Sequence, residues 1–393
     1  MIQRASVRLA SPAHEMAQEE IQKQVAYLSK EIGNPRFLEG GAVLEFDAPA
    51  ESAGDLTKQA AELAARVQRG LRSLERKIIY RSPTADRPIF RGDGRCAGVR
   101  QLGPGQVALE GLPLRLFRYF DRAFEAFGAP WDAQPVQTPA LIPSHVLAKC
   151  DYFRSFPHSV TFACHLSEAA NRIADFRARH QDRDDIDGRV LSDMETPDAC
   201  LSPAMCYHVY HMNEDRVLPE AGAAFGLCGK CFRYESSNFS GLRRLWDFTL
   251  REVVLLGSRD YVLAGRDRSL EMMSRFLDEH QLAGEIRTAS DPFFSAPDAV
   301  AKTYFQLSSE TKYEISLMLP DGERLAVGSH NYHTDFFGRA FNVCLEAGGP
   351  MHSVCVGFGL ERWVYAFLVQ HGEDPSNWPA AVRRSPEFGV ENH

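Results

Sequence analysis

One short segment carries a cation, a carboxylate and an aromatic ring at spacings that suit nucleotide chemistry. In residues 229–248, an expected strand, loop and returning strand form a hairpin that holds Arg233, Glu235 and Phe248. Side chains two residues apart on a strand share a face, so Arg233 and Glu235 project together. A fixed guanidinium suits a phosphate that gains negative charge, and a phenyl ring offers a flat surface for adenine. The alternative is a surface ion pair on an ordinary hairpin.

A second segment, CVGFGLERW at residues 355–363, has the composition of an anion site. Gly357 and Gly359 allow a ligand to approach the backbone closely, and Arg362 lies near the expected start of a helix. Two glycines followed by Glu-Arg are a weak motif on their own. Their position near the C-terminus, after the hairpin, makes the pair of segments more specific for the binding of a phosphate compound.

The nine cysteines fit reduced thiols, some of which could bind metal, because their number is odd and they are scattered between Cys96 and Cys355. Cys228 and Cys231 form a CxxC pair, which elsewhere marks a zinc knuckle or a redox site. The sequence has no second CxxC, and this pair runs into an expected strand on which side chains alternate. A zinc knuckle or redox pair therefore stays an alternative.

The elements that must position these residues fall into two expected domains. The first, residues 1–105, is a small α/β domain that ends in a linker rich in Pro, Gly and Asp. Its expected elements are a helix, a strand and a second helix, at residues 13–32, 42–46 and 55–79. The catalytic domain takes residues 106–393.

In the catalytic domain, residues 114–127 form a strongly amphipathic helix, and the strand that follows it meets Pro139. Residues 167–198 are polar and are expected to form a solvated helix and loop inserted in this domain. Apolar residues between Gly and Asp predict the sheet strands and the final core helix within residues 225–256, 301–343 and 352–370.

Bulk composition is that of an ordinary globular protein, with 393 residues, 44% hydrophobic and 24% charged. No apolar run approaches the roughly 20 residues that span a bilayer, and the first ten residues lack a signal-peptide core. We therefore expect a cytoplasmic protein without a membrane partner. The net charge of -8 gives no global positive field to hold a polyanion, so nucleic acid is not the default partner.

Three features together resemble the signature set of class II aminoacyl-tRNA synthetases over roughly residues 110–375. They are the helix and strand that end in a proline, the hairpin, and the glycine segment. Pro139 closes motif 1, Arg233 and Phe248 fall in motif 2, and Arg362 falls in motif 3. The resemblance implies an α+β fold, with an antiparallel sheet flanked by helices. It also implies ATP as a substrate and a homodimer formed through motif 1.

Within that superfamily the chain resembles seryl-tRNA synthetases, through KYEI at residues 312–315 and GSHNYHTDF at residues 328–336. More narrowly, it resembles their zinc-dependent branch, in which Cys, Glu and Cys hold a metal that binds the α-amino group of the substrate. The matching positions here are Cys206, Glu235 and Cys355. Two thiolates and a carboxylate leave one zinc position open for an amine.

Several assignments around this metal site stay open. Cys344 also lies shortly before the glycine segment and could replace Cys355, whose position next to Gly357 we favour. We expect hydrogen-bonded pocket walls rather than ligands at three histidines, His208, His330 and His333. Magnesium is implied as well, but Ala326-Val327 stands where ordinary seryl enzymes carry a Glu. The candidates to supply that carboxylate are Glu252, Glu314 and Glu346.

The chain also resembles amino acid:carrier protein ligases, which are shortened seryl-like enzymes without tRNA-binding arms. This resemblance lies in three segments and in a short amino end. The segments are LRSLERKIIYRS, YFRSFPHSVTF and SHNYHTDFFGRAFNV. It implies activation of glycine or alanine as the adenylate, then transfer to the phosphopantetheine thiol of a carrier protein. Register within motif 2 places Arg244 near the phosphates, and Glu252 and Asn331 are assigned to the amino-acid pocket. The alternatives are a seryl-type tRNA ligase and a catalytically silent synthetase paralogue.

A carrier protein, usually acidic, would need a local basic surface on this acidic chain. Two expected helices offer one. The first carries Arg66, Arg69, Arg72, Arg76 and Lys77, and the second carries Arg172, Arg177, Arg179 and Arg183. The alternative for both is a solvated helix face.

Overall fold

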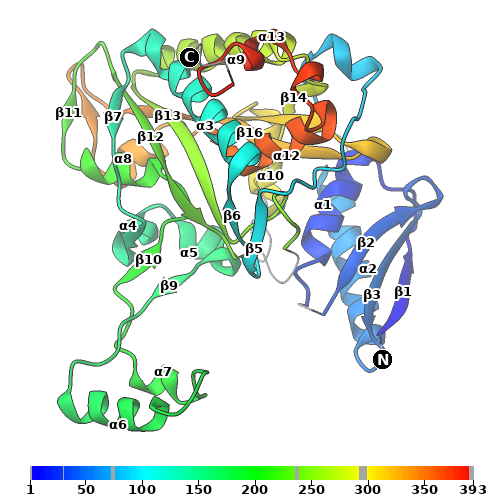
Figure 1. The fold of residues 1–393 in the computed structure, drawn as a ribbon, viewed down its shortest axis with the longest axis vertical. Coiled ribbons are helices and arrows are strands. Elements are labelled where there is room, and N and C mark those ends of the chain that lie inside the picture. Colours follow the sequence, from blue (N-terminus) through cyan, green and yellow to red (C-terminus); the bar gives the residue numbers. More distant parts are fainter. Residues whose placement is uncertain (1, 30, 72–75, 235–238, 292–298, 389–393) are drawn as a thin grey trace.

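The computed structural model describes residues 2–29, 31–71, 76–234, 239–291 and 299–388. Two sheets dominate it, a small three-stranded sheet near the N-terminus and an eight-stranded sheet that holds the functional residues (Figure 1). The α+β class expected from the sequence is confirmed.

The N-terminal domain is an antiparallel sheet in the order β1-β3-β2, covered by two helices through one apolar cluster. Its elements are β1 (Ile2–Arg8), α1 (Glu15–Val25), β2 (Gly33–Leu38), β3 (Val43–Pro49) and α2 (Ala53–Leu71). Alternation explains the sheet, because Ala5 and Val7 of β1 are buried while their neighbours are exposed. The apolar stripe of α2, with Leu56, Leu63 and Val67, packs in the same cluster.

Two boundaries expected in this domain are wrong. The first helix, expected over residues 13–32, ends at Val25, and the residues after it include β2, a strand that was not expected. The second helix was expected over residues 55–79. The structure describes it as α2 up to Leu71, and residues 78 and 79 belong instead to β4 (Ile78–Arg81). β4 pairs with β14 of the large sheet, so tertiary pairing overrides the helical spacing there. The domain boundary after residue 105 stays a prediction.

The large sheet has the order β4-β14-β15-β16-β18-β13-β12-β7. All neighbours run antiparallel except β7, which lies parallel to β12 at one edge. Besides β4, the strands are β7 (Gln134–Val136), β12 (Ala223–Phe232), β13 (Asp247–Gly257), β14 (Gly284–Thr288), β15 (Lys312–Met318), β16 (Arg324–Tyr332) and β18 (His352–Gly359).

Three helices cover one face of this sheet, namely α3 (Gly111–Glu125), α9 (Arg259–Glu279) and α12 (Leu360–His371). Aromatic packing joins them to the sheet, since the ring of Phe124 lies 4.2 Å from that of Phe358 and 4.8 Å from that of Trp363, measured between centroids. The opposite face packs against α8 (Cys206–Met212) and α11 (Phe336–Ala340). The second face is the one that carries the candidate site.

Charged contacts tie the N-terminal domain to the far edge of the large sheet. Glu19 of α1 pairs with Arg76 at 2.5 Å and with Arg287 of β14 at 3.3 Å. The side chains of Arg76 and Arg287 are 9% and 8% exposed, so these pairs are largely removed from solvent. Leu307 of α10 (Ala299–Ser308) also joins the core of the N-terminal domain. The small sheet with its helices is therefore attached to the large sheet by both charge and apolar packing.

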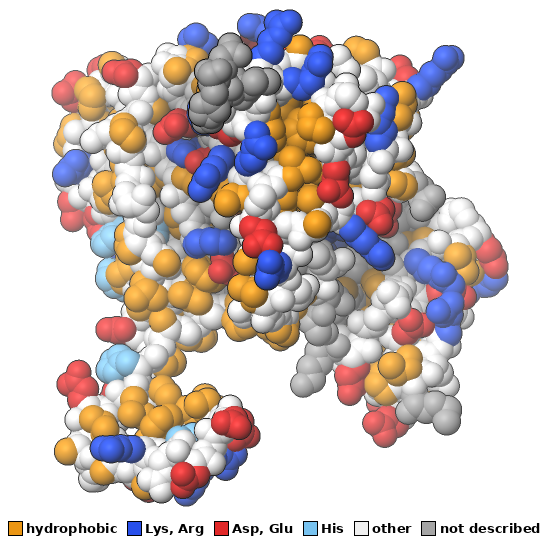
Figure 2. Space-filling view, viewed as in Figure 1, with side chains coloured by type: hydrophobic (Ala, Val, Ile, Leu, Met, Phe, Trp, Pro, Cys, Tyr) orange, Lys and Arg blue, Asp and Glu red, His pale blue; other side chains and the backbone are white. Residues whose placement is uncertain are grey.

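The inserted segment forms a lobe at the end of a narrow neck, away from the sheet (Figure 1). It contains α6 (Ala170–His180) and α7 (Val190–Asp193), and the neck strands are β9 (Phe162–Ala163) and β10 (Ala199–Leu201). No residue of α6 is buried. Apolar side chains are gathered on the lobe in Figure 2, while on the body positive and negative side chains are interspersed.

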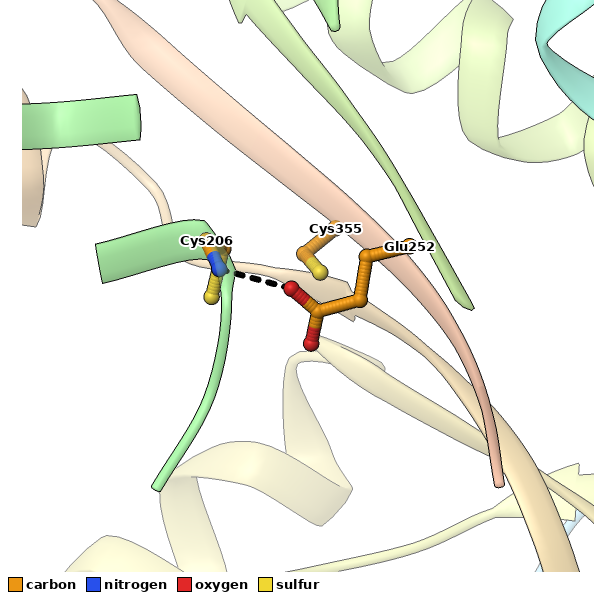
Figure 3. Close-up of side chains that lie close together, drawn as sticks. All are labelled: Cys206, Glu252 and Cys355. Carbon is orange, nitrogen blue, oxygen red and sulfur yellow. Dashed lines mark hydrogen bonds between the residues drawn. The ribbon is translucent and has the colours of Figure 1, made fainter. Parts of the chain in front are cut away.

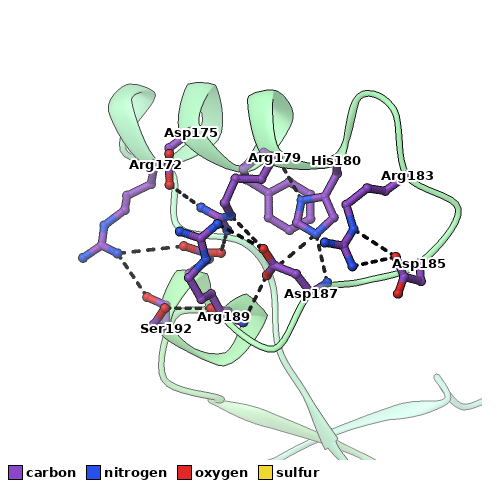
Figure 4. Close-up of polar contacts among 11 residues, drawn as sticks. Arg172, Asp175, Arg179, His180, Arg183, Asp185, Asp187, Arg189 and Ser192 are labelled. Atoms are coloured by element: carbon purple, nitrogen blue, oxygen red, sulfur yellow. Dashed lines mark hydrogen bonds and ion pairs between the residues drawn. The ribbon is translucent and has the colours of Figure 1, made fainter.

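The lobe is held together by charge rather than by an apolar core. Arg179 contacts the carboxylates of Asp175, Asp187 and Asp193 (Figure 4). The side chain of Arg179 is 10% exposed and that of Asp193 is 3% exposed. A single guanidinium thus bridges three carboxylates drawn from α6, α7 and the loop between them.

Replacing Arg179 by alanine is therefore expected to loosen the lobe and leave the large sheet intact. The three carboxylates would face one another without their shared cation, so backbone amides of residues 167–198 should exchange hydrogen about tenfold faster or more. Hydrogen exchange followed by mass spectrometry measures this. Arg183→Ala is the matched control, because Arg183 pairs with Asp185, whose side chain is 72% exposed. Equal protection in Arg179→Ala and wild type would contradict the role given to Arg179.

Candidate active site

The face of the large sheet opposite to α3, α9 and α12, here termed the open face, brings together polar side chains from three strands. Pairing places Glu252 of β13 opposite Gly357 of β18, which lies opposite Ser329 of β16. One row along, Cys355 of β18 lies opposite Asn331 of β16. Residues paired across a ladder share a face, and so do residues two apart on a strand. Glu252, Cys355 and Asn331 consequently project from the same side of the sheet.

Cys206 reaches this face from the first turn of α8. The first N–H groups of a helix have no partner within the helix, and a carboxylate is well suited to accept them. The N–H of Cys206 donates to Oε2 of Glu252 at 2.6 Å (Figure 3). The carboxylate therefore fixes the start of α8 above the sheet, with the Cys206 side chain beside it.

These three residues form a cluster of possible metal ligands. One ligand atom from each of Cys206, Glu252 and Cys355 lies within 4.8 Å of the others, and all three residues are buried (Figure 3). Two sulfur atoms and one carboxylate oxygen favour zinc over magnesium. Three protein ligands leave one position of a tetrahedral ion open, as in catalytic rather than structural zinc sites. The donor set and its spacing thus fit a catalytic zinc ion.

Burial makes the charged form of this cluster costly in the absence of a cation. It raises the pKa of Glu252 to about 7, although the N–H of Cys206 and the charge of Arg233 act in the opposite direction. The hydrogen bond with Cys206, together with burial, raises the pKa of the Cys355 thiol well above its usual value. Without metal the cluster therefore tends to hold protons, and a bound cation would displace them.

Arg233 and Phe248 lie next to this cluster. Arg233 follows the end of β12, and its Nε donates to the carbonyl oxygen of Pro203 at 2.9 Å. Its guanidinium carbon lies 5.5 Å from the centre of the Phe248 ring. Because Phe248 precedes Glu252 by four residues on β13, both side chains belong to the open face. The cation and the aromatic plane are thus adjacent, at the side of the metal cluster.

Arg362 lies where β18 passes into α12. Its Nε donates to the carbonyl oxygen of Arg243 at 2.8 Å, and its Nη1 donates to that of Ala326 at 3.0 Å. Two backbone carbonyls from different segments fix the direction of the side chain. The nearby residues Gly357 and Gly359 leave the sheet floor free of side chains beside it.

A known protein of defined function resembles the chain. Amino acid–(acyl-carrier-protein) ligase 2 of Bradyrhizobium diazoefficiens is 34% identical over 255 residues, which span 64% of this chain and 74% of that protein. The chain belongs to the amino acid–(acyl-carrier-protein) ligase family. It is thus an enzyme of the ligase class, although no protein-family model matches it.

Other similarities place the ligase on the class II synthetase fold. Type-2 serine–tRNA ligase of Methanopyrus kandleri is 27% identical over 272 residues, and the match spans 65% of this chain but 52% of that protein. The solved structure of M. kandleri SerRS in complex with A. aeolicus tRNASec aligns with a TM-score of 0.69 at 23% identity. That alignment covers 98% of the ligase and 77% of the other chain. None of the helices in the described part of the ligase has the length and apolar character that crossing a membrane requires.

The carboxylate that the structure of the ligase places with the two cysteines is Glu252. Glu235, the carboxylate expected from the sequence, lies outside the described residues. From the sequence, Glu252 is expected in the amino-acid pocket or as one of the candidate carboxylates for magnesium. Its spacing of four residues from Phe248 is a signal that could have placed it on the site face, since even spacing on a strand keeps side chains on one side.

The competing cysteines take no part in the described cluster. Cys344 lies on β17 (Cys344–Leu345), where its N–H donates to Arg216, and the cluster contains Cys355 instead. Cys228 and Cys231 are three residues apart on β12, so their side chains point to opposite faces of the sheet. The CxxC is therefore neither a zinc knuckle nor a redox pair in this fold.

Three histidines expected to be pocket walls lie outside the described cluster too. Nε2 of His208 is 3.1 Å from Oγ of Ser202, and Nδ1 of His333 is 3.2 Å from Oη of Tyr210. His330 is fully buried on β16, between Tyr313 and Val356 in the ladder. Its side chain consequently points into the core beneath the sheet, away from the site.

The remaining residues expected in the site lie at different places relative to the cluster of Cys206, Glu252 and Cys355. Asn331 is the ladder neighbour of Cys355, and its Nδ2 donates to Oγ of Ser329 at 2.9 Å. Arg244 lies on the loop between β12 and β13, where it forms a backbone bridge with Ser240. Glu314 also lies on the open face, opposite Ser329, and Lys23 and Lys312 are among the cations that lower its pKa against the effect of burial.

Proposed function

We propose that the ligase activates a small amino acid, glycine or alanine, with ATP and transfers it to the phosphopantetheine thiol of a carrier protein. One observation carries the proposal, namely the buried cluster of Cys206, Glu252 and Cys355 beside Arg233 and Phe248 on one face of the sheet. This arrangement supports a site for an amine next to a site for a nucleotide. Family membership adds weight to the same conclusion, because the relative is named for ligation of amino acids to acyl-carrier protein.

In the first step, a carboxylate oxygen of the amino acid attacks the α-phosphorus of ATP. The bond from that phosphorus to the bridging oxygen breaks, and pyrophosphate leaves with the electron pair. Negative charge grows on the phosphoryl oxygens, and Arg233 is the cation that we place against the α-phosphate. Arg362 holds the outer phosphates together with Arg244, while Phe248 supports the adenine ring. Magnesium would accompany the phosphates, and Glu314 is the carboxylate on the open face that we propose for it.

Cys206, Glu252 and Cys355 would hold zinc, which when bound supplies a Lewis-acid position for the α-amino group of the amino acid. The chain's own contribution is to fix that amine relative to Arg233, so that the carboxylate and the α-phosphate meet. Asn331, the ladder neighbour of Cys355, lines the same pocket. Specificity for a small amino acid then needs only bulk beyond the Cα atom, whereas acceptance of serine needs a placed hydrogen-bond partner.

In the second step, the carrier thiolate attacks the carbonyl carbon of the adenylate. A carbon–sulfur bond forms, the bond to the phosphate oxygen breaks, and AMP leaves. A mixed anhydride reacts readily with a positioned thiolate, so orientation of the arm supplies much of the rate. We also propose a homodimer through motif 1, which comprises α3 and β7.

The decisive experiment offers two acceptors to the activated amino acid. Enzyme, ATP and a panel of radiolabelled amino acids are incubated with bulk tRNA or with phosphopantetheinylated acyl carrier protein. We expect label from glycine or alanine on the carrier, and none when N-ethylmaleimide has blocked the carrier thiol. Stable charging of tRNA without transfer to the carrier would instead establish a tRNA ligase. Pyrophosphate exchange with a large or charged amino acid only would overturn the substrate class.

Fewer basic side chains are available to bind an acidic carrier protein than the two basic helices predicted from the sequence would offer. Arg76 is held by Glu19 and Arg179 by three carboxylates, and Arg72 lies outside the described residues. Residues 167–198 also contain nine acidic and five basic side chains, so the lobe repels an acidic partner. Arg66 and Arg69 remain exposed on α2.

The same transfer assay tests this surface. Reversal of Arg66 and Arg69 to Glu should slow transfer without changing pyrophosphate exchange, and the effect should shrink as salt rises. The matched control reverses Arg172 and Arg183 in the lobe. A loss of transfer in the control alone would move the docking face to the lobe.

A further inference from the structure

Glu361 is a buried carboxylate to which the proposed reaction gives no part. It lies in the first turn of α12, is 4% exposed, and precedes Arg362. The N–H of Thr249 donates to its two oxygens at 3.0 and 2.9 Å, and Oγ1 of Thr249 donates to Oε1 at 2.9 Å. Thr249 is 7% exposed and directly follows Phe248. One carboxylate thus receives both hydrogen-bond donors of a single residue in motif 2.

The ladder explains why this contact exists. Strands β13 and β18 pair from Gly257 and His352 to Leu250 and Gly359, and the chain then turns into α12. Thr249, the next residue of β13, consequently has no partner residue in β18. An unpaired buried N–H is costly, and Glu361 supplies the acceptor that a continued strand would have offered. The carboxylate therefore extends the pairing of β13 by one residue, next to the proposed nucleotide site.

A cation beneath the sheet completes the arrangement. Lys230 is the ladder partner of Thr249 on β12, and its Nζ lies 3.7 Å from Oε1 of Glu361 and 3.0 Å from Oδ1 of Asp247. The lysine side chain is 47% exposed, so it reaches the carboxylate from the solvent edge. Asp247 and Thr249 flank Phe248 on its strand, and both are held on the face opposite to the ring. The backbone on either side of Phe248 is thereby fixed from behind.

We propose that Glu361 is a positioning residue for ATP: its contact with Thr249 fixes the Phe248 ring and the Arg362 guanidinium relative to each other. The geometry follows from sequence neighbours, because Phe248 adjoins Thr249 and Arg362 adjoins Glu361. Arg362 is fixed from a second direction by the carbonyl oxygens of Arg243 and Ala326. This inference rests on the proposed function for the roles of Phe248 and Arg362 in nucleotide binding.

The test compares Glu361→Gln, Glu361→Asp and Thr249→Val with wild type. The amide of Gln keeps the shape of the side chain but loses its charge and one acceptor atom. We expect the KM for ATP in pyrophosphate exchange to rise about tenfold or more in Glu361→Gln, since hydrogen bonds to charged groups are the stronger ones. The KM for the amino acid should change by less than about twofold, and Glu361→Asp should lie between the two enzymes. The double variant Glu361→Gln/Thr249→Val should be no worse than the poorer single variant.

The matched control is Glu20→Gln, another buried helical carboxylate, which accepts a hydrogen bond from Gln24 in the N-terminal domain. It should leave the KM for ATP unchanged. Hydrogen exchange of the Thr249 amide, followed by NMR, reports the contact without any assay of activity. Lost protection together with a raised KM for ATP supports the proposal. Lost protection with an unchanged KM for ATP shows a purely structural contact and overturns it.

Failure of the proposed function is distinguishable from failure of this inference. If wild type shows no amino-acid-dependent exchange, the proposed function fails, and equilibrium binding of ATP then decides the role of Glu361. Weaker ATP binding by Glu361→Gln than by wild type would uphold the positioning role. Equal binding, or no binding by either protein, would overturn it.

Discussion

The substitution Glu252→Gln is expected to remove both zinc binding and amino-acid activation from the ligase. Glu252 is the carboxylate that lies within 4.8 Å of the ligand atoms of Cys206 and Cys355. An amide cannot carry the negative charge of that ligand, and loss of a direct ligand should cost more than the tenfold to hundredfold, or about 1.4–2.7 kcal/mol, typical of outer-shell changes. Metal analysis of the purified variant and pyrophosphate exchange measure the two effects. Cys206→Ala and Cys355→Ala should behave alike.

Two matched variants decide between the carboxylates and between the cysteines. Glu235→Gln and Cys344→Ala should retain zinc, because the described cluster contains Glu252 and Cys355. Zinc retained in Glu252→Gln but lost in Glu235→Gln would restore the ligand expected from the sequence. The same comparison with Cys344→Ala and Cys355→Ala tests the second thiolate.

The affinity for zinc should also fall as pH falls. Metal binding requires ionised ligands, whereas burial raises the pKa of Glu252 to about 7 and the pKa of Cys355 is raised well above its usual value. Protons therefore compete with the ion throughout the range below these pKa values. Chelator competition at pH 6, 7 and 8 should give the tightest binding at pH 8. An affinity independent of pH would show that the ligands are already ionised without the metal.

The class of the fold is predicted through the resemblance to class II synthetases, whereas the side of a strand on which a residue lies follows from alternation, which is local. The even spacing of Phe248 and Glu252 is visible in the sequence, and ladder pairing simply extends it across neighbouring strands. The hairpin motif predicts Arg233 and Phe248 in one segment, whereas Cys206 and Cys355 are predicted as ligands through the resemblance to zinc-dependent seryl enzymes. The match with Glu235 came from a resemblance in one segment, whereas the pairing of Glu252 with α8 depends on a contact over 46 residues of sequence, between Cys206 and Glu252.

The parts that sequence could not predict depend on long-range pairing. Residues 78 and 79 continue the helical spacing of the expected helix, yet the edge of the large sheet takes residues 78–81 as β4. The contact of Glu361 with Thr249 arises because β18 ends one residue too early, which only the register of the ladder shows. Arg179 of the lobe faces carboxylates of its own segment, so basic residues at helical spacing do not by themselves predict a basic surface.

The substitution Arg233→Ala is expected to remove amino-acid-dependent pyrophosphate exchange almost completely while the protein stays folded. Arg233 is the cation next to both Phe248 and the metal cluster, and charge on the α-phosphate grows only as pyrophosphate leaves. A donor that acts mainly in the transition state contributes about 10²–10³ in rate, or about 2.7–4 kcal/mol. The fall should therefore appear in kcat more than in the KM for ATP.

The result needs a control for folding, because Nε of Arg233 also donates a hydrogen bond to the carbonyl oxygen of Pro203 at 2.9 Å. Circular dichroism and zinc content should match wild type in Arg233→Ala. Arg233→Lys keeps a charge but loses the planar fork, so it should recover only part of the rate. Arg275→Ala, which removes an arginine whose side chain is 71% exposed, should be neutral. Exchange at a near wild-type rate in Arg233→Ala would remove Arg233 from the chemistry and leave Arg362 as the cation to be tested against the α-phosphate.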